Sequence, residues 1–371
     1  MARGWIRISA SLGMCAAAFA VCGASAPAAG ADSPPNVGWP DLLPALGTAE
    51  NPQPGPQPGC LSPSMACLDY EIARMREAQQ GLGCDHRGVF ATTYLVLTEV
   101  LRNTLAGDPA YFDDRDYLIY EDALFAHYYF RTLDAWESGQ AVPGAWRVAF
   151  QTAASGDANA AQDMLLGINA HVQRDMPYVM ATLGLHRPDG SSRKADHDRV
   201  NQLLDDAYGP VVRAVAANYD DFVHTTNPDT PADHLAGLEL VKTWRENVWR
   251  NAERLLDATT LEQRQAVEQS IESNAEQSAR AIAAIQQPSG YRAQRDAYCA
   301  AHFRRTPATA GPLAPRPTKT SFKRAKHKPK HRRPRRRRRG HRHPGNRTRS
   351  KRRGLAHHGR GSSQSVGPAR R

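Results

Sequence analysis

Apolar residues recur at helical spacing along most of the chain, and this periodicity limits the folds that the chain can adopt. The clearest stripe lies between residues 165 and 183. It consists of Leu165, Ile168, Val172, Met176, Val179 and Leu183. Steps of three and four residues place such side chains on one buried face of an α-helix. No segment shows the alternation of a β-strand. We therefore predict a single all-α, bundle-like domain of about eight or nine helices over residues 68–303.

Two prolines are expected to interrupt predicted helices. Pro177 lies inside the predicted helix 159–183, where a proline removes a backbone hydrogen bond and bends the helix axis. In the long segment 196–223, the dipeptide Gly209-Pro210 is expected to break the helix. The sequence therefore predicts a bent helix in the first case and two shorter helices in the second.

Residues 1–31 have the features of an export signal. Arg3 and Arg7 provide a basic start, the run 8–21 is apolar, and residues 29–31 form a small-x-small cleavage site. The apolar run is too short to span a membrane. We therefore predict a cleaved Sec-type signal peptide and a secreted protein.

The segments on either side of the helical domain lack apolar periodicity. Residues 32–67 are rich in Pro and Gly and are predicted to form an exposed linker. Residues 304–371 contain 25 Lys and Arg and no Asp or Glu, whereas all 37 acidic residues precede them. High charge without apolar side chains predicts a disordered, polybasic tail.

The basic tail indicates a class of partner. Runs of Arg and Lys attract polyanions by releasing counterions, without sequence preference. For a secreted protein, the polyanions within reach are anionic cell-wall polymers, anionic lipid surfaces and extracellular nucleic acid. The alternative is a tail without function, translated from an overrun reading frame.

The cysteines predict disulfides. Four of them lie beyond the signal segment, namely Cys60, Cys67, Cys84 and Cys299. An even number in an oxidising compartment is typical of two disulfide bonds, and three pairings are possible. We favour Cys60 with Cys67, which closes a short loop, and Cys84 with Cys299, which ties the first long helix to the last.

His171 and Asp175 are the leading candidates for a functional site. They are four residues apart, so both side chains project from the same side of the predicted helix, one turn apart. Imidazole and carboxylate groups are both suitable ligands for zinc. A divalent metal site would need further ligands, for which His127 and Asp198 are the candidates.

Such a site would support hydrolysis of a phosphoester. A metal lowers the pKa of its bound water to about 7, and the resulting hydroxide can attack phosphorus. Arg174 or Arg245 could stabilise the charge that develops. In the competing interpretation these residues are structural: Asp175 holds His171 or pairs with Arg174 to fix helix packing, and His127 packs among its aromatic neighbours.

Several segments resemble a known family. They are CDHRGVFATTY (84–94), LFAHYYF (124–130), INAHVQRDMP (168–177), ADHDRVNQLL (195–204) and WRENVWRNAERL (244–255). Together they resemble an actinobacterial family of helical proteins of unknown function. The resemblance implies one helical domain over about residues 68–303 and implies no activity.

Two further resemblances concern metal ligands. Gly167, His171, Asp175 and Pro177 resemble a pattern of the all-helical zinc-dependent phospholipase C and nuclease families. Those families place another His after the proline, where this chain has Val179 and Met180, so the resemblance implies at most a reduced metal set. A weaker resemblance, to the HD phosphohydrolases, rests on the dipeptide at 197–198, with His171 upstream and an Asp at 220 or 221 downstream.

Two functions of different classes remain open from the sequence. The first is a secreted, metal-dependent phosphoester hydrolase with His171 and Asp175 as ligands, zinc being the expected metal. The second is a non-catalytic protein of the cell envelope, whose helical body binds a partner or small ligand and whose tail attaches to an anionic surface. The positions of the candidate ligands in space distinguish the two.

Overall fold

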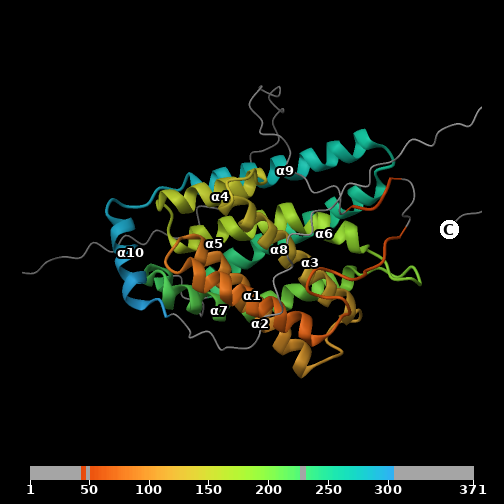
Figure 1. Cartoon of the computed structure of the whole chain (residues 1–371), viewed down its shortest axis with the longest axis horizontal. Coiled ribbons are helices and arrows are strands. Elements are labelled where there is room, and N and C mark those ends of the chain that lie inside the picture. Colours follow the sequence, from red (N-terminus) through yellow and green to blue (C-terminus); the bar gives the residue numbers. More distant parts are fainter. Residues whose placement is uncertain (1–42, 47–50, 226–230, 305–371) are drawn as a thin grey trace, which may run out of the picture. The chain divides into compact units, whose positions relative to one another are not determined.

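The computed structural model describes residues 43–46, 51–225 and 231–304, and these residues form helices joined by short connections (Figure 1). The helices are α1 (Met65–Leu82), α2 (Arg87–Gly107), α3 (Arg115–Glu137), α4 (Gly144–Ser155), α5 (Ala160–Ile168), the π-helix η3 (Asn169–Asp175), α6 (Met176–Leu183), α7 (Lys194–Asn218), the 3₁₀-helix η4 (Asp221–Thr225), α8 (Pro231–Asp257), α9 (Leu261–Ala283) and α10 (Tyr291–His302). No β-strand occurs within these ranges. The predicted all-α fold class is confirmed.

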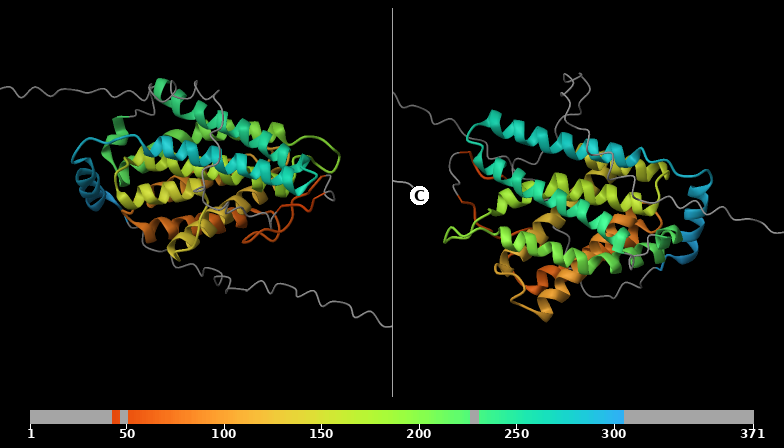
Figure 2. Two further views of the ribbon diagram at one scale, coloured as in Figure 1. Left: turned by 90° about the horizontal axis from the view of Figure 1, so that it is seen from above. Right: turned by 180° about the vertical axis from the view of Figure 1, so that it is seen from behind.

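The continuous run α5–η3–α6 lies in the middle of the helical body. In Figure 1 it runs between the pair α1 and α2 on one side and the pair α4 and α9 on the other. The right-hand view in Figure 2, seen from behind, shows the same order. Because helices cover this run from several sides, its residues 176–181 are all buried. Any polar side chain on this run must therefore find its partners inside the protein.

A π-helical turn precedes Pro177 and accounts for the irregularity that was expected there. In η3 the helix widens, and the Met176 amide donates to the carbonyl oxygen of His171, five residues back. Pro177 then lies in the first turn of α6, where its missing amide hydrogen costs little. The sequence therefore predicted an interruption at this place but not its form.

The prediction of a helix break at Gly209-Pro210 is wrong, because α7 continues through both residues. Leu203 and Ala207 are buried before the proline, and Val211 is buried after it. Packing of this face holds the helix together on both sides of Pro210. The hydrogen bond that the proline cannot donate would be accepted at position 206, which is exposed and can be hydrated.

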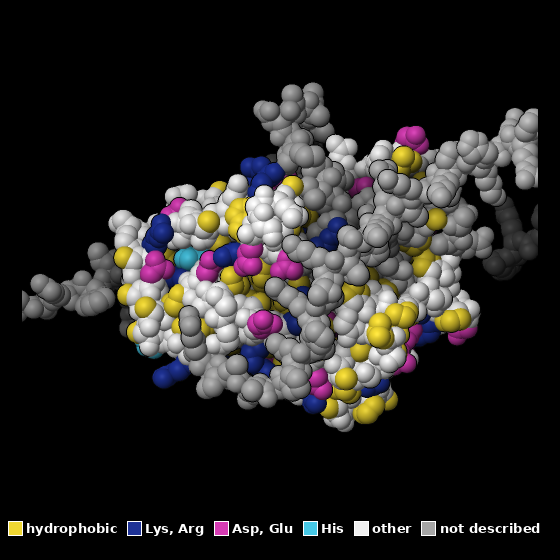
Figure 3. Space-filling model, in the orientation of Figure 1, with side chains coloured by type: hydrophobic (Ala, Val, Ile, Leu, Met, Phe, Trp, Pro, Cys, Tyr) yellow, Lys and Arg dark blue, Asp and Glu magenta, His cyan; other side chains and the backbone are white. Residues whose placement is uncertain are grey.

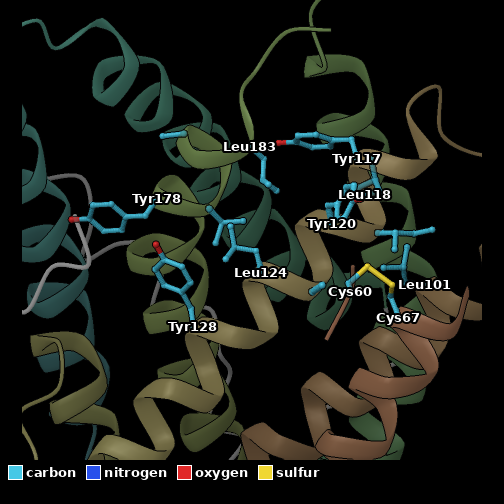
Figure 4. Packing of buried hydrophobic residues seen from close by; sticks show 14 of the residues in the cluster. Cys60, Cys67, Leu101, Tyr117, Leu118, Tyr120, Leu124, Tyr128, Tyr178 and Leu183 are labelled. Carbon is cyan, nitrogen blue, oxygen red and sulfur yellow. A yellow bond between two sulfur atoms is a disulfide. The ribbon is translucent and has the colours of Figure 1, made fainter. Parts of the chain in front are cut away.

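Both predicted disulfides are confirmed. Cys60 is bonded to Cys67 in α1, and Cys84, in the connection between α1 and α2, is bonded to Cys299 in α10. Figure 4 shows the first disulfide beside Leu101 in the hydrophobic core. The second closes a loop with a sequence separation of 215 residues. In the chain-entropy model such a loop stabilises the fold by about 5 kcal/mol.

Part of the segment predicted as an exposed linker packs against the helices. Cys60 is only 1% exposed. The carbonyl oxygen of Pro52 lies so close to Gly184 that a Cβ atom there would approach it to 1.8 Å, and Gly184 has a φ of +84°. Gln53 Oε1 accepts a hydrogen bond of 3.0 Å from Arg193. Residues 51–64 are therefore part of the folded body, because the disulfide and these polar contacts hold them there.

The other predicted boundaries stay predictions. The signal segment 1–31 and the polybasic tail from residue 305 lie outside the described residues.

Candidate functional site

The structure brings His171 and Asp175 together on the π-helical turn. His171 Nδ1 lies 3.0 Å from Asp175 Oδ2, and the two side chains are 3% and 0% exposed. The ring of Phe125 stacks on the imidazole at a centroid distance of 3.4 Å. Burial lowers the pKa of His171, although the hydrogen bond to Asp175 opposes this shift. The pair is thus enclosed by the core, with a neutral imidazole.

Both carboxylate oxygens of Asp175 have protein partners. Arg174 Nη1 donates to Oδ1 over 3.0 Å. Trp146 Nε1 donates to Oδ2 over 2.9 Å, and His171 contacts the same oxygen. Arg174 is itself fully buried and also contacts Glu272 at 2.8 Å. This arrangement has the form of a structural network, in which Arg174 compensates buried carboxylates and does not face a substrate.

The two further ligand candidates lie in different environments. Asp198 is 51% exposed on α7 and pairs with Lys194, whereas Asp175 has no exposed surface. His127 is half-buried on α3, where burial and the charges of Arg131 and Arg74 lower its pKa to about 4. The structure therefore does not bring Asp198 into the environment of Asp175. Over the described ranges, no group of three or more His, Cys, Asp and Glu side chains could hold a metal ion.

Arg245, the second candidate for stabilising an anion, is buried on α8. Its Nη2 donates to the carbonyl oxygen of His197 over 2.6 Å, and its Nε donates to Asn201 over 3.0 Å. Burial lowers the pKa of Arg245 to about 10. A second contact joins the same two residues, because His197 Nε2 lies 3.0 Å from the Arg245 carbonyl oxygen. These contacts join α7 to α8.

The residues that resemble the metal ligands of the HD phosphohydrolases also lie in different environments. His197 is 4% exposed, whereas its neighbour Asp198 points to solvent. Asp220 accepts from the amides of Ala160 and Phe222. The Asp220 carboxylate therefore already has hydrogen-bond partners at the start of α5 and of η4.

A second His–Asp pair, which the sequence analysis did not single out, lies at a pocket. His86 precedes α2 and Asp163 lies on α5, and His86 Nδ1 is 2.6 Å from Asp163 Oδ2. The two side chains are 6% and 3% exposed. The pocket is small, with room for about one or two water molecules. It is lined by His86, Arg87, Phe90, Tyr129, Trp146, Ala149, Phe150, Ala153, Asp163 and Gly167.

Each member of this second pair retains one buried atom without a hydrogen bond. Asp163 Oδ1 and His86 Nε2 have no hydrogen-bond partner among the described residues. Asp296 of α10 lies close to Nε2, with its Oδ1 3.7 Å away. Burial raises the pKa of Asp163, and the hydrogen bond from His86 opposes this shift. Unlike Asp175, Asp163 can therefore still accept a hydrogen bond.

The neighbourhood of His86 is fixed by the second disulfide and by α10. Arg295 Nη1 donates to the carbonyl oxygen of Cys84 over 2.7 Å, and it also contacts Asp296 at 3.2 Å. Cys84 is bonded to Cys299 on the same helix. Only the segment CDHRG, which the resemblance included, could have drawn attention to His86, because Asp163 is 77 residues away.

Two buried carboxyl groups on α1 and α3 have no comparable support. Glu71 is 1% exposed, and neither of its carboxylate oxygens has a hydrogen-bond partner in the part of the chain that the structure describes. Burial raises the pKa of Glu71 to about 8, although the charge of Arg74 opposes this shift. Burial and the neighbouring Glu121 raise the pKa of Asp122 to about 7. These groups make the folded state sensitive to pH.

One face of the helical body has mixed charge. On the face that Figure 3 shows, acidic and basic side chains are interspersed. None of the described helices is both long enough and apolar enough to cross a membrane.

Comparison with known proteins gives a family and no activity. No curated protein and no solved structure matches the chain. One family model matches residues 69–285, which is more than half of the chain and includes both His–Asp pairs. The matched segment ends before α10. The chain therefore belongs to the family of unknown function DUF5995.

Proposed function

We propose that this chain is an exported, non-catalytic protein of the cell envelope, whose helical body binds a small ligand or partner and whose basic tail attaches it to anionic polymers or surfaces. The observation that carries the proposal is the state of Asp175. Both of its oxygens are held by protein donors, and it has no exposed surface. A metal-dependent hydrolase would need this carboxylate as a ligand and an open coordination position for water.

The distribution of charge supports attachment through the tail. Residues 304–371 carry 25 Lys and Arg and no acidic residue, whereas acidic and basic side chains are mixed on the face of the body in Figure 3. A polyanion therefore meets most of its countercharge on the tail. Binding of this kind weakens steeply as salt is added.

The attachment is tested with the full chain and a variant in which the five arginines 335–339 are replaced by glutamine. Binding to vesicles containing anionic lipid and to soluble cell-wall polymer is measured at salt concentrations from about 50 to about 200 mM. Over this range, counterion release makes such binding strongly dependent on salt. We expect weaker binding and a shallower salt dependence for the variant. Equal binding and an equal slope would rule out attachment through this run.

One observation favours the rival, a metal-dependent phosphoester hydrolase. His171 Nε2 is buried and has no hydrogen-bond partner within the described ranges, so it could serve as a ligand. Such an enzyme would use a metal-bound hydroxide, with Asp175 reoriented away from Arg174. Elemental analysis of untagged protein separates the two functions. Stoichiometric zinc that is lost in His171→Ala would favour the rival and justify a screen of phosphoester substrates, and metal-free, folded protein would support the binding function.

A further inference from the structure

The last helix, α10, lies across one end of the helical body (Figure 1, Figure 2). It follows the connection 284–290, which contains Pro288. The buried residues of this helix are Tyr291, Arg295 and Cys299, spaced four residues apart on a single stripe. Its other residues are half-buried or exposed. The helix is therefore attached to the body along one narrow face.

Little apolar surface holds this face in place. Of the three buried residues of α10, Cys299 belongs to a hydrophobic cluster of the body, together with Val89, and Phe303 after the helix packs against the same cluster. Tyr291 instead contributes its hydroxyl group, which donates a hydrogen bond to Asp220 Oδ2. Because burial of apolar area is the main source of packing free energy, the non-covalent attachment of α10 is weak.

Burial of Arg295 also leaves polar atoms without partners at this interface. Arg295 is 1% exposed, and its Nε and Nη2 atoms have no hydrogen-bond partner within the described ranges. On the body, the same holds for Asp163 Oδ1 and His86 Nε2. Burial raises the pKa of Asp163, and the nearby charge of Arg295 is among the interactions that oppose this rise. Buried polar groups without partners cost free energy, so they disfavour the packed position of α10.

The disulfide between Cys84 and Cys299 holds α10 on the body despite these unfavourable contacts. Cys84 lies within the segment 69–285 that the family model matches, whereas Cys299 lies beyond it. The matched segment thus corresponds to a helical body without α10. The bond joins that body to a helix that it does not need for its own core.

The two disulfides differ in how easily a thiol can reach them. Cys60 and Cys67 are 1% and 4% exposed and lie in the hydrophobic core. Cys84 is half-buried, whereas its partner Cys299 has no exposed surface. Thiol–disulfide exchange requires access of a thiolate to one sulfur atom. A reductant therefore reaches Cys84 Sγ before any other sulfur of the two bonds.

We propose that the Cys84–Cys299 disulfide is a redox switch for α10. In the oxidised protein, α10 covers His86 and Asp163, and reduction of the bond releases α10 while the rest of the helical body stays folded. The switch operates whatever the body or the tail binds, so it goes beyond the proposed function.

The reducing step requires a dithiol. One thiolate of the dithiol attacks Cys84 Sγ, a mixed disulfide forms, and Cys299 leaves as a thiolate that takes up a proton. The second thiol of the dithiol loses its proton and attacks the mixed disulfide at the sulfur of the reductant. Cys84 then leaves as a thiolate and is protonated in turn. The protein gains two electrons and two protons, and the dithiol becomes a disulfide.

The experiment uses the oxidised protein with its tail, incubated at neutral pH with increasing concentrations of dithiothreitol. Iodoacetamide blocks the free thiols, and mass spectrometry identifies the blocked cysteines. We expect Cys84 and Cys299 to be reduced before Cys60 and Cys67. Hydrogen–deuterium exchange is then measured on protein in which only the first pair is blocked. Exchange in α10 should become at least about tenfold faster, and exchange in α3 and α9 should change by less than about twofold.

Two double variants separate the switch from a general effect of disulfide loss. Cys84→Ser with Cys299→Ser should give the same fast exchange in α10 without any reductant. The matched control, Cys60→Ser with Cys67→Ser, removes the core disulfide and should leave α10 protected. The proposal is overturned if α10 stays protected after its disulfide is reduced, if α3 and α9 lose protection with it, or if Cys60 and Cys67 are reduced first. Reduction of the unaltered chain decides the question even if a variant does not fold.

Discussion

The two His–Asp pairs of this protein differ in what surrounds the carboxylate. Asp175 accepts hydrogen bonds from Trp146 and Arg174 as well as from His171, and it is completely enclosed. Asp163 contacts His86 at the edge of a pocket and keeps one oxygen without a described partner. The same two residue types therefore form a structural network in one place and an incompletely satisfied site in the other. Partners, rather than residue identity, distinguish the two pairs.

The pairs are also close neighbours, separated by aromatic side chains that line the pocket and also contact His171. Phe90 lines the pocket, and its ring lies 5.7 Å from that of His171. Gly167 makes this position of Phe90 possible, because a Cβ atom at residue 167 would approach the phenyl ring to 2.3 Å. The enclosed pair and the pocket thus share a wall.

The largest effect is expected from Asp175→Asn. The substitution removes the charge that Arg174 and His171 face inside the core, and breaking a buried ion pair is costly. We expect a loss of about 3 kcal/mol in the free energy of unfolding, measured by urea denaturation with both disulfides intact. The control Asp198→Asn, at an exposed ion pair, should change it by less than about 0.5 kcal/mol. Similar small losses for both variants would contradict the structural role of Asp175.

We expect Glu71, a buried carboxyl group without an imidazole partner, to make the stability of the protein depend on pH. The folded state raises the pKa of Glu71 from 4.5 to about 8. The folded protein therefore binds more protons than the unfolded chain in this interval, and its stability falls as pH rises from about 4.5 to about 8. The slope from one such group is at most about 1.4 kcal/mol per pH unit.

Urea denaturation between pH 5 and 8 measures this slope, and Glu71→Gln should reduce it. Asp122, whose pKa is raised to about 7, falls in the same interval and leaves a residual slope in the variant. Identical slopes for the variant and the original chain would exclude Glu71 as the titrating group.

The shared wall is tested by Gly167→Ala. The added methyl group collides with Phe90, including its Cβ atom at 2.7 Å, so rotation of the ring alone does not relieve the contact. Overpacking costs about 1–3 kcal/mol, and the better helix propensity of alanine offsets about 1 kcal/mol of this. We expect a net loss of about 1 kcal/mol in the free energy of unfolding, measured by urea denaturation. Gly81→Ala, where a Cβ atom meets nothing within 4 Å, is the matched control in α1 and should not destabilise the protein.

A small effect on stability, similar in size to that of Gly167→Ala, is expected from Asp163→Asn, the counterpart of Asp175→Asn. An asparagine can still accept a hydrogen bond from His86, and solvent at the mouth of the pocket can hydrate the pair. We expect a loss of about 1 kcal/mol, measured by the same urea denaturation. A loss as large as that of Asp175→Asn would mean that the two pairs have equivalent structural roles, and the distinction between them would fail.

The features that could be predicted from the sequence are those that depend on local spacing. Met176, Val179 and Leu183 of the predicted stripe are buried, whereas Leu165, Ile168 and Val172 are only half-buried. The spacing of His171 and Asp175 predicted their contact. The cysteine pairing followed from loop length and compartment. Each of these predictions needs only the spacing of residues along the chain or the number of cysteines.

The features that could not be predicted depend on contacts between distant segments. His86 meets Asp163 only because α2 packs against α5, and no spacing marks that contact. The enclosure of Asp175 depends on Trp146 from α4. The continuation of α7 through Pro210 likewise depends on burial along its whole face, which outweighs the local preference of proline.

The Cys84–Cys299 disulfide changes the covalent topology of the molecule. With this bond in place, the chain from residue 84 to residue 299 is a closed ring. A single proteolytic cut within the ring opens it but leaves both products in one covalent molecule. The cut therefore remains invisible in a non-reducing gel, and only a reductant separates the two fragments. A protein built in this way can be nicked once and still keep His86, Asp163 and α10 tethered to one another.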